Sequence, residues 1–174
     1  PTMNAALDGI SKSGIRVFTQ MAKQEPGCLF LTLGEPDFDT PASIREAAKA
    51  SLDAGDTHYP ENNGQPFLRQ AIARFEQEKH GLSYAPDEII VTVGATEALF
   101  CALFGILNPG DEVIVPTPAF GLYEAIIKLC RGVCVPLDTR ADGFQIRPAA
   151  LQAALSPRTK AIILTSPNNP TGCI

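Results

Sequence analysis

The sequence has no basic surplus and no long apolar run. Its 174 residues carry 14 Lys and Arg against 19 Asp and Glu, a net charge of −5. It therefore lacks the positive charge with which proteins neutralise the phosphates of nucleic acids. No apolar run approaches the roughly 20 residues of a membrane-spanning helix, and residues 1–18 lack the apolar core of a signal peptide. We therefore expect neither a nucleic-acid partner nor a membrane.

The cysteines lack the pairing that disulfides and zinc sites use. They are five in number, and no two of them have CxxC spacing, so neither kind of site is expected. Cys101 and Cys130 fall on apolar faces of segments with helical periodicity, and we predict that both are buried free thiols. Free thiols are typical of proteins in the reducing cytoplasm, which is the location that we expect.

Strands and helices are predicted to alternate in the second half of the chain. The composition, 45% hydrophobic and 19% charged, is ordinary for a globular domain with one core. The predicted strands lie at 89–93, 112–115, 133–137 and 160–165, and helices are predicted after Gly94, over 121–130 and over 148–155. Because these strands are apolar on both faces, we predict an α/β fold with three layers, in which helices cover both sides of a mostly parallel sheet.

The first half predicts a mixture of helices and irregular loops. A helix is expected over 11–23 and a strand over 28–33. Thr40 is expected to cap a helix whose first residue is Pro41, and Pro66 is expected to open another. No repeat or low-complexity tract interrupts either half.

The turn at Gly94 could hold an anion. An apolar, β-branched run ends there and a helical pattern begins at once. Backbone N–H groups at the start of a helix have no partner within it, and the helix dipole is positive at this end. Together with the Thr96 hydroxyl they would bind a phosphate. The alternative is an ordinary strand-to-helix turn that binds nothing.

Three unusual loops follow predicted strands, at 94–96, 116–120 and 166–172. Ligands of open α/β sheets bind beyond the carboxyl ends of the strands, where these loops would lie. The GxGxxG fingerprint of dinucleotide-binding proteins and the GxxxxGK[ST] loop of nucleotide triphosphatases are both missing. The string SPNNPTG at 166–172 is the most specific of the three, because prolines on both sides would hold its two amide side chains in fixed directions. A plain turn is the alternative here.

Five motifs, in this order, carry a resemblance to a known family: LGEPDFDTP, HYPENNGQPFLR, VGATEAL, NPGDEVIVPTPAF and SPNNPTG. The chain resembles the first part of a class I/II aminotransferase, an enzyme of fold type I that uses pyridoxal phosphate. The resemblance implies that residues 1–35 form an N-terminal arm and part of a small domain. It implies that residues 36–174 form the first half of the large, cofactor-binding domain.

The resemblance also implies roles for the residues of the three loops. Gly94 opens the turn at which Ala95 and Thr96 match the positions that bind the cofactor phosphate. Phe120 matches the aromatic residue that stacks on the pyridine ring, although many members of the family have Trp or Tyr there. Asn169 matches the asparagine that donates a hydrogen bond to the phenolic oxygen of the ring.

Two residues outside those loops are also implied to take part. Gly34 matches the glycine whose backbone lies against the substrate carboxylate, and Tyr59 matches the tyrosine that reaches the phosphate of the neighbouring subunit. A homodimer with shared sites is therefore implied. Without the resemblance, Phe120 would be interpreted as a core residue, Tyr59 as a surface residue and Gly34 as a turn glycine.

Three groups that the family's chemistry needs are expected beyond Ile174. They are the Schiff-base lysine, an acidic partner of the pyridine nitrogen and an arginine for the substrate carboxylate. None of the six lysines lies in the context of the Schiff-base motif. We therefore expect this chain to be a fragment that has no catalytic residue and is inactive by itself.

Three functions remain open for the whole protein. The first is transfer of an amino group between an amino acid and a 2-oxo acid. The second is elimination by a C–S lyase of the same fold. The third is an aminotransferase-like sensory domain of a transcription regulator, which would follow a winged helix-turn-helix.

Overall fold

The computed structural model describes residues 7, 10, 14–32 and 34–174. The described residues from 14 onward divide into two compact units, one within 14–93 and one of residues 94–174.

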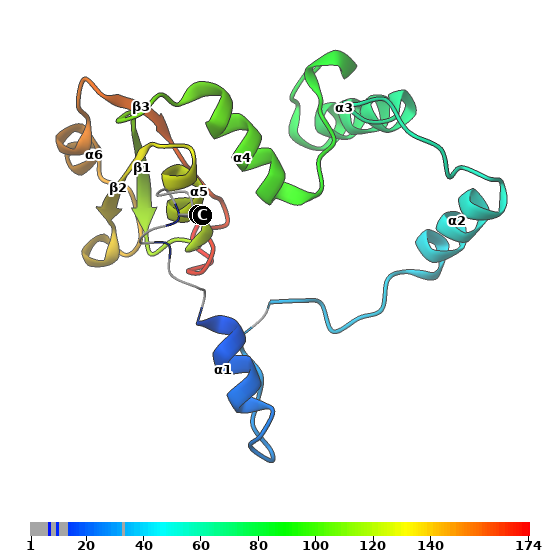
Figure 1. Ribbon diagram of the computed structural model, residues 1–174, viewed down its shortest axis with the longest axis horizontal. Coiled ribbons are helices and arrows are strands. Elements are labelled where there is room, and N and C mark those ends of the chain that lie inside the picture. The colour runs from blue at the N-terminus through cyan, green and yellow to red at the C-terminus, as the bar shows by residue number, and fades with distance from the viewer. Residues whose placement is uncertain (1–6, 8–9, 11–13, 33) are drawn as a thin grey trace, which may run out of the picture. The chain divides into compact units, whose positions relative to one another are not determined.

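The unit of residues 94–174 contains a sheet of three parallel strands (Figure 1). Its strand order is β2-β1-β3, with β1 in the centre. The elements are α4 (Gly94–Ile106), β1 (Glu112–Thr117), α5 (Leu122–Leu129), β2 (Val133–Asp138), η3 (Arg140–Asp142), α6 (Pro148–Ala154) and β3 (Thr159–Ile162). The predicted α/β fold with a parallel sheet is confirmed, and the strands lie within one or two residues of the predicted starts.

The hydrophobic core lies between one face of β1 and the helices α4 and α5. Val113 and Val115 alternate along β1 and are almost completely buried there. They pack with Leu103 of α4 and with Ile126 and Ile127 of α5. Burial of each such side chain contributes about 1.5–3 kcal/mol to the free energy of unfolding. The central strand is therefore the element on which this unit depends.

Close packing at Gly132 explains why no larger residue stands directly before β2. A Cβ atom on Gly132 would lie 2.9 Å from Leu107 Cδ1 and 3.1 Å from Ile127 Cγ2. The turn before β1, predicted from Asn-Pro-Gly-Asp at 108–111, is also present. Gly110 has φ +89°, and Asp111 N donates a hydrogen bond of 3.0 Å to Asn108 O. These contacts allow β1 and β2 to start side by side.

A buried carboxylate joins the amino ends of β1 and β3. Glu112 is 6% exposed, and it accepts hydrogen bonds from Arg158 Nε at 2.8 Å and Ser156 Oγ at 2.6 Å. The backbone N–H of Glu112 also donates to Arg158 O at 2.8 Å. The hydrogen bonds from Ser156 and Arg158 lower the pKa of Glu112 below its ordinary value of 4.5.

The unit of residues 14–93 consists of helices joined by long loops. They are α1 (Ile15–Ala22), α2 (Ala42–Asp53), α3 (Pro66–His80) and η2 (Pro86–Glu88). Arg69 of α3 is buried, and its guanidinium donates to Gly64 O at 3.0 Å, Pro86 O at 2.9 Å and Glu61 Oε2 at 2.8 Å. One side chain therefore fastens the loop before α3 to the segment after it.

Two predicted strands are wrong. Residues 28–32 and 89–93 form no strand, and residue 33 lies outside the described residues. The N–H of Val91 bonds to Asn63 O at 3.0 Å and that of Cys28 to Glu25 O at 3.2 Å, so these groups are satisfied outside a sheet. A strand requires a neighbour to take its backbone hydrogen bonds, and composition alone does not supply one.

Two smaller predictions also need correction. The helix expected at Thr40 starts at Ala42 with Pro41 as its N-cap, and no side chain caps it. Cys101 is exposed, whereas Cys130 is buried as predicted, and all five thiols are free. Leu99 and Leu103 of α4 pack against the core. Cys101 lies midway between them in the sequence and points away, because successive helical residues are about 100° apart.

No helix within 14–32 and 34–174 is long and apolar enough to cross a membrane.

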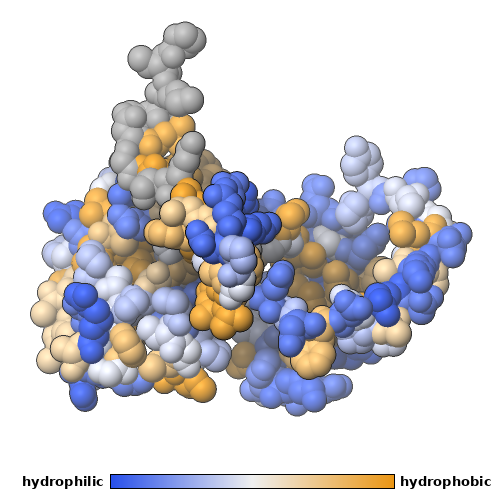
Figure 2. All heavy atoms as spheres, turned by 90° about the horizontal axis from the view of Figure 1, so that it is seen from below, coloured by the Kyte–Doolittle hydropathy of each residue, from blue (hydrophilic) through white to orange (hydrophobic). Residues whose placement is uncertain are grey.

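Large apolar side chains are exposed on the surface, among charged ones (Figure 2). In the unit of residues 14–93, Leu29, Leu31 and Phe38 are more than four-fifths exposed. In the other unit, Phe100 and Phe104 of α4 stack at 5.6 Å and remain partly open. These side chains are available to pack against another chain or segment.

The carboxylate at the base of the sheet predicts a specific acid sensitivity. Because the pKa of Glu112 is lowered in the folded state, its contribution to stability is complete above the unfolded value and is lost as pH falls through the folded value. We expect Glu112→Gln to lower the free energy of unfolding of the full-length protein at pH 7, and the difference from wild type to shrink as pH falls below about 4.5. Urea unfolding from pH 7 to pH 3 measures this.

The control is Glu124→Gln, which removes an exposed surface pair with Lys128. Surface pairs contribute little, so this variant should follow wild type at every pH. A difference between Glu112→Gln and wild type that stays constant with pH would show that Glu112 is not stabilised as an anion.

Candidate functional site

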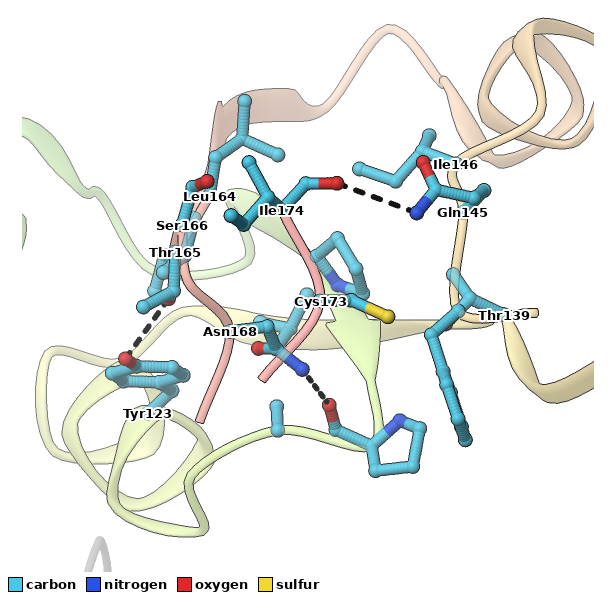
Figure 3. A pocket seen from close by; sticks show the side chains of 16 residues that line it. Tyr123, Thr139, Gln145, Ile146, Leu164, Thr165, Ser166, Asn168, Cys173 and Ile174 are labelled. Carbon is cyan, nitrogen blue, oxygen red and sulfur yellow. Dashed lines mark hydrogen bonds between the residues drawn. The ribbon is translucent and has the colours of Figure 1, made fainter. Parts of the chain in front are cut away.

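The loops after β1 and β3 meet at the carboxyl edge of the sheet. One hydrogen bond joins the two loops, because Asn168 Nδ2 donates to Pro118 O at 3.1 Å. A second bond joins α5 to the segment after β3, where the Tyr123 and Thr165 hydroxyls lie 3.0 Å apart (Figure 3). The loops meet because parallel strands end at the same edge, and β3 pairs directly with β1. Two of the three loops singled out in the sequence are thus adjacent.

The loop after β3 is held by bonds within itself. Asn168 Nδ2 also donates to Thr171 Oγ1 at 2.8 Å, and the Asn168 N–H donates to Cys173 O at 2.8 Å. Gly172, at φ +72°, donates its N–H to Asn168 O at 2.7 Å. Its positive φ is the conformation that glycine adopts without strain. The loop is therefore rigid, and the exposed Asn169 extends from it.

A cavity of about 300 Å³ lies between the two loops. Figure 3 shows Tyr123, Asn168 and Ile174 around it. Its lining is mainly apolar, with hydroxyl and amide groups from Thr139, Thr165 and Asn168. A mostly apolar hollow with a few polar groups is typical of a small-molecule site.

Phe120 lies at the end of the β1 loop, just before α5. Its ring packs edge to face on Tyr123, with centroids 5.7 Å apart and an interplanar angle of 85°. It lines a second hollow of about 150 Å³ and is 38% exposed. Phe120 is thus fixed on one side and open on another, an arrangement that allows a flat ligand to stack on it.

The start of α4 has the features of an anion site. Gly94 has φ +79°, and no atom lies within 4 Å of the place where a Cβ would stand. Ala95 and Thr96 are exposed in the first helical turn, where N–H groups lack an intrahelical acceptor. A phosphate could approach this backbone closely and accept hydrogen bonds from it.

The remaining two residues predicted for the site lie in the other unit. Gly34 is exposed, with open space around its Cβ position. Tyr59 is fully exposed in the loop before α3. The roles of Gly34 and Tyr59 stay predictions. The roles of the site residues within 94–174 also stay predictions, although the bond between Asn168 and Pro118 brings Phe120 and Asn169 into adjacent loops.

Two titratable groups of β2 have shifted pKa values. The hydrogen bonds from Arg140 lower the pKa of Asp138, at the end of the strand, to about 2, so this carboxylate is too weak a base for proton transfer near neutral pH. Burial raises the pKa of the Cys134 thiol, near the amino end of the strand, which therefore stays neutral. Neither group is suited to general-base or nucleophilic chemistry near neutral pH.

Asn168 and Tyr123 are the site residues that sequence reasoning missed. The string SPNNPTG indicated that two amides would be held in fixed directions, but nothing in it distinguished the asparagine that ties the loops from its exposed neighbour. Tyr123 lies on the apolar side of α5, and no sequence signal separates it from the core residues beside it.

Comparison with known proteins finds relatives over nearly the whole chain. The sequence model described as aminotransferase class I and II matches residues 26–174. The aspartate/prephenate aminotransferase of Thermus thermophilus is 44% identical over 156 residues, covering 89% of this chain and 40% of that protein. The arginine–pyruvate transaminase AruH of Pseudomonas aeruginosa is 40% identical over 98% of this chain and 44% of its own length.

Solved structures give the same result. A single mutant of Thermus thermophilus aspartate aminotransferase matches with a TM-score of 0.90 and 39% identity, covering 99% of this chain and 46% of that protein. The chain therefore spans less than half the length of these relatives.

Proposed function

The chain belongs to the class I and II aminotransferase family, and we propose that the whole protein transfers an amino group between an amino acid and a 2-oxo acid with pyridoxal phosphate as cofactor. Its parallel sheet with helices is the fold of the aminotransferases of fold type I. The observation that carries the proposal is the match over residues 26–174, which includes every motif of the candidate site.

The residues at the start of α4 fit the phosphate of this cofactor. The open space at Gly94 would let an anion reach the exposed N–H groups of Ala95 and Thr96, and the Thr96 hydroxyl would donate a further hydrogen bond. The dipole of α4, 13 residues long, adds favourable charge at this end. When bound, pyridoxal phosphate carries the amino group and takes up the negative charge that develops on the substrate.

Phe120 and Asn169 fit the ring of the cofactor. The open side of Phe120 would stack on the flat ring and exclude water from that face. The amide of Asn169 would donate to the phenolic oxygen and favour its deprotonated form. The backbone at Gly34 would lie against the substrate carboxylate. These residues bind and orient, and we place the catalytic lysine in the part of the relatives that lies outside the match, so the 174 residues alone should be inactive.

We further propose a homodimer with shared sites. The fully exposed Tyr59 hydroxyl is available to the phosphate of a second subunit, and the exposed apolar side chains of both units offer surface for assembly. The five free thiols fit a reducing cytoplasm.

The identity of the amino acid is not part of the proposal. The aspartate/prephenate and arginine–pyruvate enzymes match at 44% and 40% identity, so similarity does not favour an acidic over a basic substrate. Both relatives are named for amino transfer, which favours it over elimination or a sensory role.

The proposal is tested with purified full-length protein, pyridoxal phosphate, a panel of amino acids and 2-oxoglutarate or pyruvate. We expect one new amino acid and one new 2-oxo acid in equal amounts, without release of ammonia. Formation of ammonia with a 2-oxo acid and a thiol would instead identify a C–S lyase and contradict the proposal.

Replacing Thr96 tests the phosphate site. In the full-length protein, Thr96→Ala should lose one charge-assisted hydrogen bond, about 1.5–3 kcal/mol, and raise the Kd of pyridoxal phosphate by roughly ten- to a hundredfold. Thr96→Ser keeps the hydroxyl and should bind nearly as wild type does. Equilibrium dialysis measures both, and an unchanged Kd in Thr96→Ala would remove this residue from the site.

Hybrid dimers test the shared site. Tyr59→Phe should raise the Kd of the cofactor while the protein stays dimeric. In a hybrid of one Tyr59→Phe subunit with one Thr96→Ala subunit, sharing predicts one intact site and one site with both defects. We therefore expect one tight cofactor per hybrid dimer. If Tyr59 instead serves its own subunit, each site of the hybrid carries one defect, and a hybrid dimer with no tight site would contradict sharing.

A further inference from the structure

We propose that Asn168 is a positioning residue that fixes the separation between Phe120, against the ring face, and Asn169, at the ring edge. The inference rests on the proposed function, because the roles of Phe120 and Asn169 come from it. Asn168 itself touches neither the cofactor nor the substrate in this proposal. It acts through the two loops that it joins.

The hydrogen bonds of Asn168 use both N–H groups of its amide. One donates to Pro118 O at 3.1 Å, in the loop after β1, and the other donates to Thr171 Oγ1 at 2.8 Å, in its own loop. The side chain is half-buried, and its bond to Pro118 O is the dashed line that starts at Asn168 in Figure 3. An amide in this position can join two loops without adding charge beside a phosphate-binding edge.

This tie lies beyond the last ladder bonds of the sheet. The backbone of Ile163 donates to Ile114 O at 3.0 Å, and the chain then leaves β1. Pro118 has no N–H, so its carbonyl is the polar backbone group through which this residue can be held. Asn168 donates to that carbonyl. The tie therefore joins Pro118, two residues before Phe120, to the residue directly before Asn169.

Two contacts with one rigid ring depend on this spacing. A planar ligand can stack on Phe120 and accept a hydrogen bond from Asn169 together only if the two loops keep their separation. Without the tie, the hydrogen bond at the phenolic oxygen would lengthen. Because that bond favours the deprotonated oxygen, the bound cofactor would lose its proton at higher pH.

A purely local role for Asn168 would give a different result. In that case the bond to Thr171 would matter and the bond to Pro118 would not. Thr171→Val removes the acceptor within the loop and leaves the tie between the loops in place. This variant is therefore the matched control.

The test uses full-length protein, pyridoxal phosphate, and two measurements: the Kd from equilibrium dialysis and the pH midpoint of the bound cofactor's visible absorbance. Asn168→Asp keeps the shape of the side chain, removes both N–H donors and places a carboxylate oxygen opposite Pro118 O. Because its charge by itself would repel an anionic ligand, the uncharged Asn168→Ser, too short to reach Pro118, is measured beside it. We expect about a tenfold higher Kd and a higher pH midpoint in both variants. Thr171→Val should change the Kd less than about twofold and leave the midpoint unchanged.

A double variant shows whether Asn168 acts through its neighbour. In an Asn169→Ala background, Asn168→Asp should no longer move the midpoint. A midpoint shift of the same size with and without Asn169, or an equal shift in Thr171→Val, would overturn the inference. If Asn168→Asp does not fold, Asn168→Ser serves in the same comparison.

The two measurements distinguish a wrong role for Asn168 from a wrong role for Asn169. If Asn169→Ala moves the midpoint and Asn168→Asp moves neither quantity, the positioning role alone is wrong. If Asn169→Ala by itself leaves both quantities unchanged, the proposed role of Asn169 is wrong and the inference falls with it.

Discussion

The parallel pairing of β1 between β2 and β3 is the constraint on which the rest of the described structure depends. Parallel strands end at one edge, so segments far apart in sequence, after β1 and after β3, become neighbours. The burial of Val113 and Val115 against α4 and α5 fixes this arrangement from one side. Without it, Phe120 and Asn169, which are separated by nearly fifty residues, would have no reason to lie in adjacent loops.

The two ends of the sheet are fastened by different chemistry. At the amino end, the buried carboxylate of Glu112 accepts hydrogen bonds from Ser156 and from the largely exposed Arg158, which makes an ionic tie. At the carboxyl end, Asn168 ties the loops through a neutral amide. An uncompensated carboxylate there would repel an anionic ligand. The neutral tie therefore suits the edge at which we place the cofactor, and the ionic tie suits the edge that only has to be stable.

Sequence reasoning succeeded where local signals and tertiary structure agree. The strands β1 to β3 are short apolar runs with Gly or Pro at their ends, and Gly94 starts α4 as predicted. It was wrong at 28–32 and 89–93, because a strand needs a partner that a local pattern does not reveal. It also could not separate Asn168 from Asn169: the two residues are identical in type, and only the loop geometry shows which one faces the neighbouring strand's loop. The roles of Gly34 and Tyr59 stay predictions.

We propose that the starts of α4 and α5 and the SPNNPTG loop form one pyridoxal phosphate site. A crystal structure of the full-length protein with the cofactor bound tests this arrangement. We predict the phosphate on the N–H groups of Ala95 and Thr96, the ring on Phe120, the phenolic oxygen at Asn169, and Tyr59 reaching the phosphate from the partner subunit. A cofactor bound with its phosphate away from the start of α4, or with its ring out of contact with both Phe120 and Asn169, would contradict the account.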